Sequence, residues 1–256
     1  MTHTVTDAVR ALCLGLPEAA EKLSHGMANF HVQGKTFATY AVNHHGDGRV
    51  ALWLEAAPGA QTLHTELEPT HYFVPPYVGP KGWLGVILDS GIGWDAVEKR
   101  VREAYASVAP GTLSEQLKRI PTSKPPTDPI PAEEFDPLQT DHAQSVLNRL
   151  TVLCETLPET TTTRQFGNPV WKAGKKTFVC VHRYDGRLCI QAWVGGEQQA
   201  FLTDDPRYRI PAYVGHNGWI DLDIEDRINW EEVEQLVENS YRHFALKRML
   251  KKLDSE

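Results

Sequence analysis

The sequence of 256 residues lacks the features that most readily assign a chain to a membrane or to an export pathway. No apolar run approaches the roughly 18 residues that are needed to cross a bilayer. The first seven residues contain neither the basic region nor the apolar region of a signal peptide. We therefore expect no membrane partner and a cytoplasmic location.

Signatures of catalysis and of bound metal are also missing. The four cysteines form no Cys-x-x-Cys pair and no Cys/His set at metal-ligand spacing. No nucleophile elbow, Ser–His–Asp set or pair of acid–base carboxylates appears. We therefore predict no catalytic residue, no metal site and no cofactor. Cys180 and Cys189 can face each other across a hairpin, and in a reducing compartment we expect them to be free thiols.

Positive charge is in short supply, since 26 Lys and Arg residues stand against 33 Asp and Glu residues and the formal net charge is −7. An acidic protein gains no attraction to nucleic acid from its overall field and needs a local basic patch. One basic cluster lies near the end of the sequence. Its position is typical of a solvated last helix whose cations oppose the helix dipole. The cluster consists of Arg242, Lys247, Arg248, Lys251 and Lys252.

What the sequence does contain is an internal repeat as long as a domain. Leu16-Pro17-Glu18 returns as Leu157-Pro158-Glu159, and Lys35-Thr36-Phe37 returns as Lys176-Thr177-Phe178. The segment 75–83 returns as 211–219, and the order is kept while the offset drifts only from 141 to 136. A repeat of this length indicates two copies of a whole folded unit rather than a solenoid.

Each copy predicts the same order of elements: helix, three strands, short helix, two strands and long helix. Strands are expected at about 29–32, 36–42 and 49–54, and again at about 169–172, 177–182 and 187–193. Neither copy shows the alternation of strand and helix that builds a parallel sheet. We therefore predict an α+β protein of two repeated domains, each an antiparallel sheet flanked by helices. The expected boundaries are 1–118 and 139–256, joined by a proline-rich linker at 119–138 that runs semi-extended.

The repeated residues resemble the MmcQ/YjbR family. The resemblance rests on Leu-Pro-Glu after the first helix, on Tyr-Val-Gly-x-x-Gly-Trp before a strand, and on a tyrosine near the end of the last helix. Pro80 replaces the usual histidine of the first copy, and Asn217 replaces the usual lysine of the second. The resemblance implies a CyaY-like or secretion-chaperone-like α+β fold, and it implies DNA binding, because the family often carries that label.

The Tyr-Val-Gly-x-x-Gly-Trp segment is the best candidate for a functional loop, because two glycines let the backbone approach a ligand between two aromatic side chains. The simpler interpretation is a turn between strands, with the tyrosine and the tryptophan packed into the core. The lysine that opens the second predicted strand of each copy is a further candidate contact. The candidates for a ligand or a nucleic acid are Lys35, Tyr77, Lys81, Trp83, Trp171, Lys176, Tyr213, His216, Asn217 and Trp219.

Three functions follow from these patterns. The first is a non-catalytic tandem binding protein that binds nucleic acid, with lysines for the phosphates and tryptophans for base stacking. The second is a chaperone-like module for a protein or a peptide, in which the two copies form an intramolecular pseudo-dimer. The third is a small-molecule-binding protein or an enzyme of unknown reaction, with a pocket at the aromatic loop.

Overall fold

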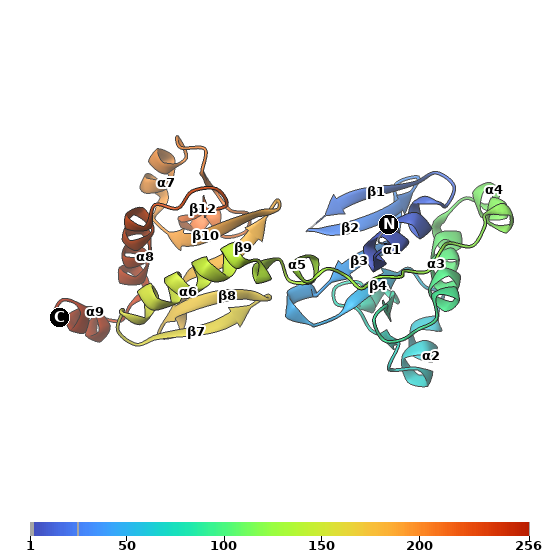
Figure 1. Ribbon diagram of the computed structural model, residues 1–256, viewed down its shortest axis with the longest axis horizontal. Coiled ribbons are helices and arrows are strands. Elements are labelled where there is room, and N and C mark those ends of the chain that lie inside the picture. Colours follow the sequence, from blue (N-terminus) through green and yellow to red (C-terminus); the bar gives the residue numbers. More distant parts are fainter. Residues whose placement is uncertain (1–2, 25, 256) are drawn as a thin grey trace. The chain divides into compact units, whose positions relative to one another are not determined.

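The computed structural model describes residues 3–24 and 26–255 and divides into two compact units, residues 1–135 and 136–256. Each unit contains one six-stranded antiparallel sheet, and Figure 1 shows the elements of both. The strand order is β1-β2-β3-β4-β6-β5 in the first unit and β7-β8-β9-β10-β12-β11 in the second, which is the same topology. The predicted α+β class and the two repeated domains are confirmed.

The first unit contains α1 (Val5–Leu14), β1 (Ala19–Ser24), β2 (Met27–Val32), β3 (Lys35–Val42), β4 (Val50–Leu54), α2 (Ala60–Leu67), β5 (Tyr72–Phe73), β6 (Leu84–Ile87), α3 (Trp94–Val108), α4 (Gly111–Ser114) and α5 (Ala132–Phe135). Short 3-10 turns lie at His44–Gly46, Gly79–Lys81 and Glu115–Arg119. The predicted strands correspond to β2, β3 and β4, whereas β1 was not predicted.

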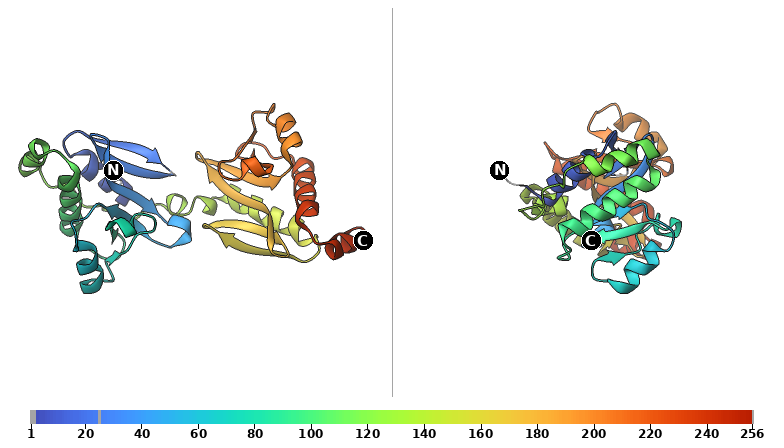
Figure 2. Two further views of the ribbon diagram at one scale, coloured as in Figure 1. Left: turned by 180° about the vertical axis from the view of Figure 1, so that it is seen from behind. Right: turned by 90° about the vertical axis from the view of Figure 1, so that its right-hand side faces the viewer.

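The second unit contains α6 (Asp141–Glu155), β7 (Thr160–Gln165), β8 (Asn168–Ala173), β9 (Lys176–Tyr184), β10 (Arg187–Trp193), α7 (Gly196–Leu202), β11 (Tyr208–Arg209), β12 (Trp219–Asp223), α8 (Trp230–Phe244) and α9 (Lys247–Leu253). Here the unpredicted strand is β7. In Figure 1 and in the left panel of Figure 2, α9 lies beside the start of β7 and the end of β8.

The edge strands β1 and β7 explain the extra strand in each copy. Strand β7 reads Thr-Thr-Thr-Thr-Arg-Gln and is exposed along almost its whole length. An edge strand that packs against no layer needs no alternation of apolar and polar residues, so it carries no periodic signal. Its pairing to β8 runs from Thr160 opposite Ala173 to Gln165 opposite Asn168.

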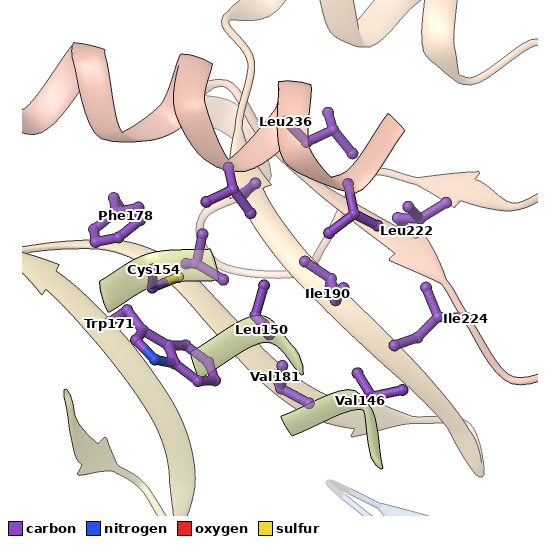
Figure 3. Close-up of a cluster of buried hydrophobic side chains, with 14 of the residues drawn as sticks. Val146, Leu150, Cys154, Trp171, Phe178, Val181, Ile190, Leu222, Ile224 and Leu236 are labelled. Carbon is purple, nitrogen blue, oxygen red and sulfur yellow. The ribbon is translucent and has the colours of Figure 1, made fainter. Parts of the chain in front are cut away.

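The core of each unit lies between one face of the sheet and two long helices. In the second unit α6 contributes Val146, Leu150 and Cys154, and α8 packs over them, as Figure 3 shows. Trp171 of β8 points into this layer and is only 1% exposed. The proposal that Trp171 stacks on a base is therefore wrong, because its position on β8 places the ring on the core side of the sheet.

The Leu-Pro-Glu motif closes this core. The hydroxyl of Tyr241 on α8 donates a hydrogen bond of 2.6 Å to the backbone oxygen of Pro158, and Tyr105 on α3 donates an equal bond to Pro17. The residue after each proline has a positive φ, 54° at Glu159 and 53° at Glu18, so the chain turns sharply into the edge strand. The repeated tyrosine and the repeated Leu-Pro-Glu are thus two halves of one contact.

The hairpin between β9 and β10 turns at Asp185 and Gly186, whose φ values of 51° and 77° are typical of a two-residue hairpin turn with positive φ at both positions. Its register places Cys189 opposite His182 and Cys180 opposite Gln191. The expectation that Cys180 and Cys189 face each other is therefore wrong. All four cysteines are free thiols.

The proline-rich segment after α3 runs along the first unit instead of leaving it. Ser123 donates its backbone N–H to Glu98 on α3 at 2.9 Å and accepts a hydrogen bond from Trp94 Nε1 at 2.8 Å. Arg102 on the same helix donates to the backbone oxygens of Leu117 and Pro121 at 3.1 and 2.9 Å. We call residues 117–125 the strap. In the described part of the chain no helix is long and apolar enough to span a membrane.

Candidate functional site

The Tyr-Val-Gly-x-x-Gly-Trp segment forms the same loop in both units, and we call residues 75–83 and 211–219 the tyrosine loops. A glutamine on the preceding short helix clamps each one. Gln61 on α2 donates from Nε2 to the backbone oxygens of Gly79 and Trp83, at 2.9 and 2.5 Å. Gln199 on α7 donates to Gly215 and Trp219 in the same way, at 2.7 and 2.6 Å. Neither glutamine was predicted from the sequence, although their equivalent positions in the two copies are a signal that could have identified them.

The two glycines of the loop are required by its geometry. Gly82 and Gly218 have φ values of 89° and 86°, a region that side chains with a Cβ rarely adopt. A Cβ at Gly79 would lie 2.5 Å from Cγ1 of Val74, and one at Gly215 would lie 2.3 Å from Cγ2 of Ile210. The glycines therefore serve a tight turn, and nothing in their placement calls for a phosphate.

The tyrosine at the tip of each loop is strained and exposed. Tyr77 and Tyr213 have φ values of 64° and 67°, which is unusual for a bulky side chain. The residue after each tyrosine donates its N–H to the backbone oxygen of the residue before it, at 2.7 and 2.8 Å. This is the strained γ-turn with positive φ, which is rare in proteins. The side chains remain in water, at 66% exposure for Tyr77 and 80% for Tyr213.

The tryptophan at the end of each loop is the anchor that the simpler interpretation expected. Trp83 is 9% exposed and packs with Trp53 and Ala51 on the sheet face opposite the helices. Trp219 is half-buried, and its ring stacks on Phe244 with centroids 5.5 Å apart. Trp83 is therefore a buried residue rather than a free stacking platform.

The remaining predicted residues spread over several places. Lys81, His216 and Asn217 are exposed on the tyrosine loops. Lys35 and Lys176 are exposed at the starts of β3 and β9, and no hydrogen bond or ion pair within residues 3–24 and 26–255 links either one to its loop. Within each unit the exposed candidates thus lie on two separate segments, the tyrosine loop and the start of β3 or β9.

Lys176 instead belongs to a cluster of cations at one end of the second unit. The β8–β9 turn approaches the residue before α9, because a Cβ at Gly174 would lie 3.9 Å from Cδ1 of Leu246. Arg248 on α9 forms a two-pronged ion pair with Glu159, which directly precedes β7. These contacts join the turn to α9. We call the joined set the basic cluster: Lys172, Lys175, Lys176, Lys247, Arg248, Lys251 and Lys252.

The lysines of this cluster are available, whereas most arginines of the unit are not. In the described part of the chain no lysine takes part in an ion pair. By contrast Arg183 pairs with Glu225, and Arg187 pairs with Asp223 and Asp226. Arginines that already face carboxylates add little positive potential, and Arg248 is one of them. The positive potential of the basic cluster therefore comes from its lysines.

A polar network that the sequence analysis missed occupies the open face of the second sheet. Asp221 on β12 is fully buried, and its Oδ1 accepts hydrogen bonds from His182 at 3.1 Å and Gln191 at 2.8 Å. The guanidinium of Arg209 lies 3.7 Å from Oδ2 and donates to the Sγ of Cys189 at 2.7 Å. The matching register positions of the first sheet carry apolar or small residues: Gly85, Ala41, Trp53, Phe73 and Ala51.

Burial governs the chemistry of the thiols in this network. It raises the pKa of Cys189 to about 11 and that of Cys180 to about 12, because a thiolate is poorly solvated there. Neither thiol is an activated nucleophile, since activation requires a lowered pKa. We therefore interpret the network as a structural one, which holds Arg209 in place on this face of the sheet.

The chain is a tandem of two α+β units, each built from a six-stranded antiparallel sheet, two core helices and a clamped tyrosine loop. The sequence model of the YjbR family matches residues 14–107 and again residues 155–243, so the chain belongs to the YjbR family and carries its domain twice. A crystal structure of Deinococcus radiodurans protein DR2400, which contains the domain DUF419, is similar to this chain at 20% identity. The similarity covers 48% of this chain and 93% of that one, with a TM-score of 0.37. A search of curated proteins gives no match.

Proposed function

We propose that this protein is a non-catalytic nucleic-acid-binding protein whose second repeat contacts phosphate groups through the basic cluster. The proposal is supported by the approach of the β8–β9 turn to Leu246, because this turn carries Lys175 and Lys176 and Leu246 directly precedes α9 and its cations. Residues more than 70 positions apart in the sequence thereby contribute to one positive surface on an acidic protein.

The free lysines suit a phosphate backbone. Lysine is a flexible point charge with three donors, and it needs no fixed geometry to approach a phosphate. Each cation that neutralises a phosphate releases a condensed counterion, so binding strength falls steeply with added salt. The negative charge of the rest of the protein opposes nonspecific adsorption elsewhere, which confines the contact to the basic cluster.

The packing of α9 favours a nucleic acid over a lipid surface. Met249 is fully buried, and Leu250 and Leu253 pack against the core of the second unit. The apolar side of the helix is therefore already used, and the cations point away from the core. A helix that inserts into a membrane interface needs that apolar side free.

The test is fluorescence anisotropy with labelled 20-nucleotide DNA, single-stranded and double-stranded, from 25 to about 200 mM salt. We expect a steep loss of affinity with salt. The variant Lys247→Ala/Lys251→Ala/Lys252→Ala should lower the slope of log K against log salt by about 2 to 3 units. Vesicles with anionic lipid, added as competitor, should displace little of the DNA.

The matched control is Lys99→Ala/Lys118→Ala/Lys124→Ala, which removes three exposed lysines of the first unit and changes the net charge by the same amount. The control should bind like the wild type. If both triple variants lose affinity equally, general charge and not the basic cluster is responsible. If the wild type retains no DNA at low salt, the proposed function fails.

A second candidate function is the binding of a protein or a peptide. It is favoured by large apolar side chains that are exposed at equivalent positions of the two units. Leu63 on α2 corresponds to Phe201 on α7, and Val74 before the first tyrosine loop corresponds to Ile210 before the second; all four are more than half exposed. A peptide-display selection should then enrich sequences whose binding is lost in Val74→Ser/Ile210→Ser.

A further inference from the structure

The strain at the two tyrosines needs an explanation that folding does not provide. Glycine would adopt the positive φ of Tyr77 and Tyr213 without cost, whereas a bulky residue in such a conformation costs on the order of 1–3 kcal/mol. Burial of the rings offsets little of this strain energy, because the two side chains are 66% and 80% exposed. Both repeats nevertheless carry tyrosine at this position, so the ring itself is what the loop presents.

The loop presents that ring rigidly. The γ-turn hydrogen bond fixes the backbone on either side of the tyrosine, and the glutamine clamp fixes the rest of the loop to the short helix. In the first unit the hydroxyl of Tyr77 also makes a 2.9 Å hydrogen bond with Nε2 of His45. A tyrosine has only two side-chain torsions, so little conformational entropy remains to be lost when the ring meets a partner.

The tryptophans that the sequence suggested for base stacking do not offer a free ring face. Trp171 lies in the core, and Trp83 is buried under its own loop. The half-buried Trp219 already stacks one face on Phe244. The exposed aromatic residues on the repeated motif are the tyrosines. We propose that Tyr77 and Tyr213 are stacking residues for unpaired bases, and that the ligand of this protein is single-stranded nucleic acid.

This proposal rests on the proposed function, because the basic cluster supplies the attraction that brings a strand to the second unit. The bases of a duplex are stacked on one another and do not show their faces, whereas an unpaired base can lie flat on an aromatic ring. Stacking does not select a particular base, since every base has such a face. The exposed polar side chains of His216 and Asn217 next to the second tyrosine suit a sequence-tolerant contact of this kind.

The experiment compares two 20-nucleotide single strands that carry the same phosphates, one of thymidine and one whose central residues are abasic. The variant Tyr77→Leu/Tyr213→Leu keeps a large apolar side chain and the strained backbone but removes the ring. Its affinity for the thymidine strand should fall by about 5- to 150-fold, the range for the loss of one stacked base. Its affinity for the abasic strand should change less than about twofold.

The variant Tyr77→Phe/Tyr213→Phe retains the rings and should bind the thymidine strand nearly as well as the wild type. Unchanged melting temperatures of both variants would show that the exposed side chains do not affect folding. If the leucine variant binds both strands as the wild type does, or loses both equally, base stacking is refuted while the phosphate contact stands. If the wild type binds neither strand, the proposed function and this inference fall together.

Discussion

Replacing the two strained tyrosines by glycine should leave the protein more stable than replacing them by alanine. The comparison to make is between Tyr77→Gly/Tyr213→Gly and Tyr77→Ala/Tyr213→Ala. Both variants lose the same ring contacts and the same hydrogen bond between Tyr77 and His45, so these losses cancel in the comparison. Only the glycine variant relieves the positive φ of 64° and 67°, since alanine keeps the Cβ that opposes it.

The magnitude follows from two opposing terms at each position. Relief of the backbone strain contributes about 1–3 kcal/mol, and the greater freedom of glycine in the unfolded chain costs about 0.4–1 kcal/mol. The free energy of unfolding of the glycine variant should therefore exceed that of the alanine variant by roughly 0.5–2 kcal/mol per unit. For units of this size that corresponds to a melting temperature higher by about 2 to 10 °C.

Urea denaturation of the full chain, followed by tryptophan fluorescence and circular dichroism, measures the difference. Each single variant should affect the transition of its own unit, so Tyr213→Gly and Tyr77→Gly serve as controls for each other. An alanine variant that is as stable as the glycine variant, or more stable, would refute the claim that these tyrosines are strained. The glycine variant should at the same time lose affinity for the thymidine strand, because it has no rings.

Three further predictions concern the core and the polar network. Burial raises the pKa of Cys180 to about 12 and that of Cys189 to about 11. At pH 8 iodoacetamide should therefore modify neither thiol in the folded protein, and it should modify both in urea. Rapid labelling of the native state would contradict the burial of these thiols. Tyr241→Phe should lower the free energy of unfolding by about 1–2 kcal/mol, because the backbone oxygen of Pro158 loses its hydrogen-bond donor. An unchanged urea midpoint would argue against this 2.6 Å hydrogen bond. Arg209→Met should lower the free energy of unfolding by about 3 kcal/mol, because it leaves buried Asp221 without its cation. The double variant Arg209→Met/Asp221→Asn should recover a large part of the lost stability. A double-mutant cycle that shows no coupling energy would rule out the pairing.

The repeat and the antiparallel class could be predicted from the sequence because they depend on local signals. Equivalent motifs at nearly constant offset identify the two units, and the Asp47-Gly48 turn signal marks the hairpin between β3 and β4. The edge strand β7 could not be predicted, because Thr160–Gln165 faces water on nearly every residue and has no period. Trp171 shows a second limit. A tryptophan next to a lysine on a strand is compatible with either face, and only the register of the sheet decides which.

The basic cluster and the polar network depend on contacts between distant segments. The β8–β9 turn meets Leu246 only because α9 folds back to that turn, and no pattern in either segment predicts this approach. Asp221 and Arg209 are brought together by the pairing of two short strands that the turn signals do not reveal. Tyr77 and Tyr213 were predicted as site residues, but their strain required the backbone torsions.

The strap has a practical consequence for anyone who wishes to produce the first repeat alone. A fragment that ended at residue 118 would remove Ser123 and leave Glu98, which is only 5% exposed, facing solvent beside an unshielded Trp94. Such a truncation should be poorly soluble or prone to aggregate. An expression clone that extends through Phe135 keeps these partners, together with the hydrogen bond between Thr6 and Glu134.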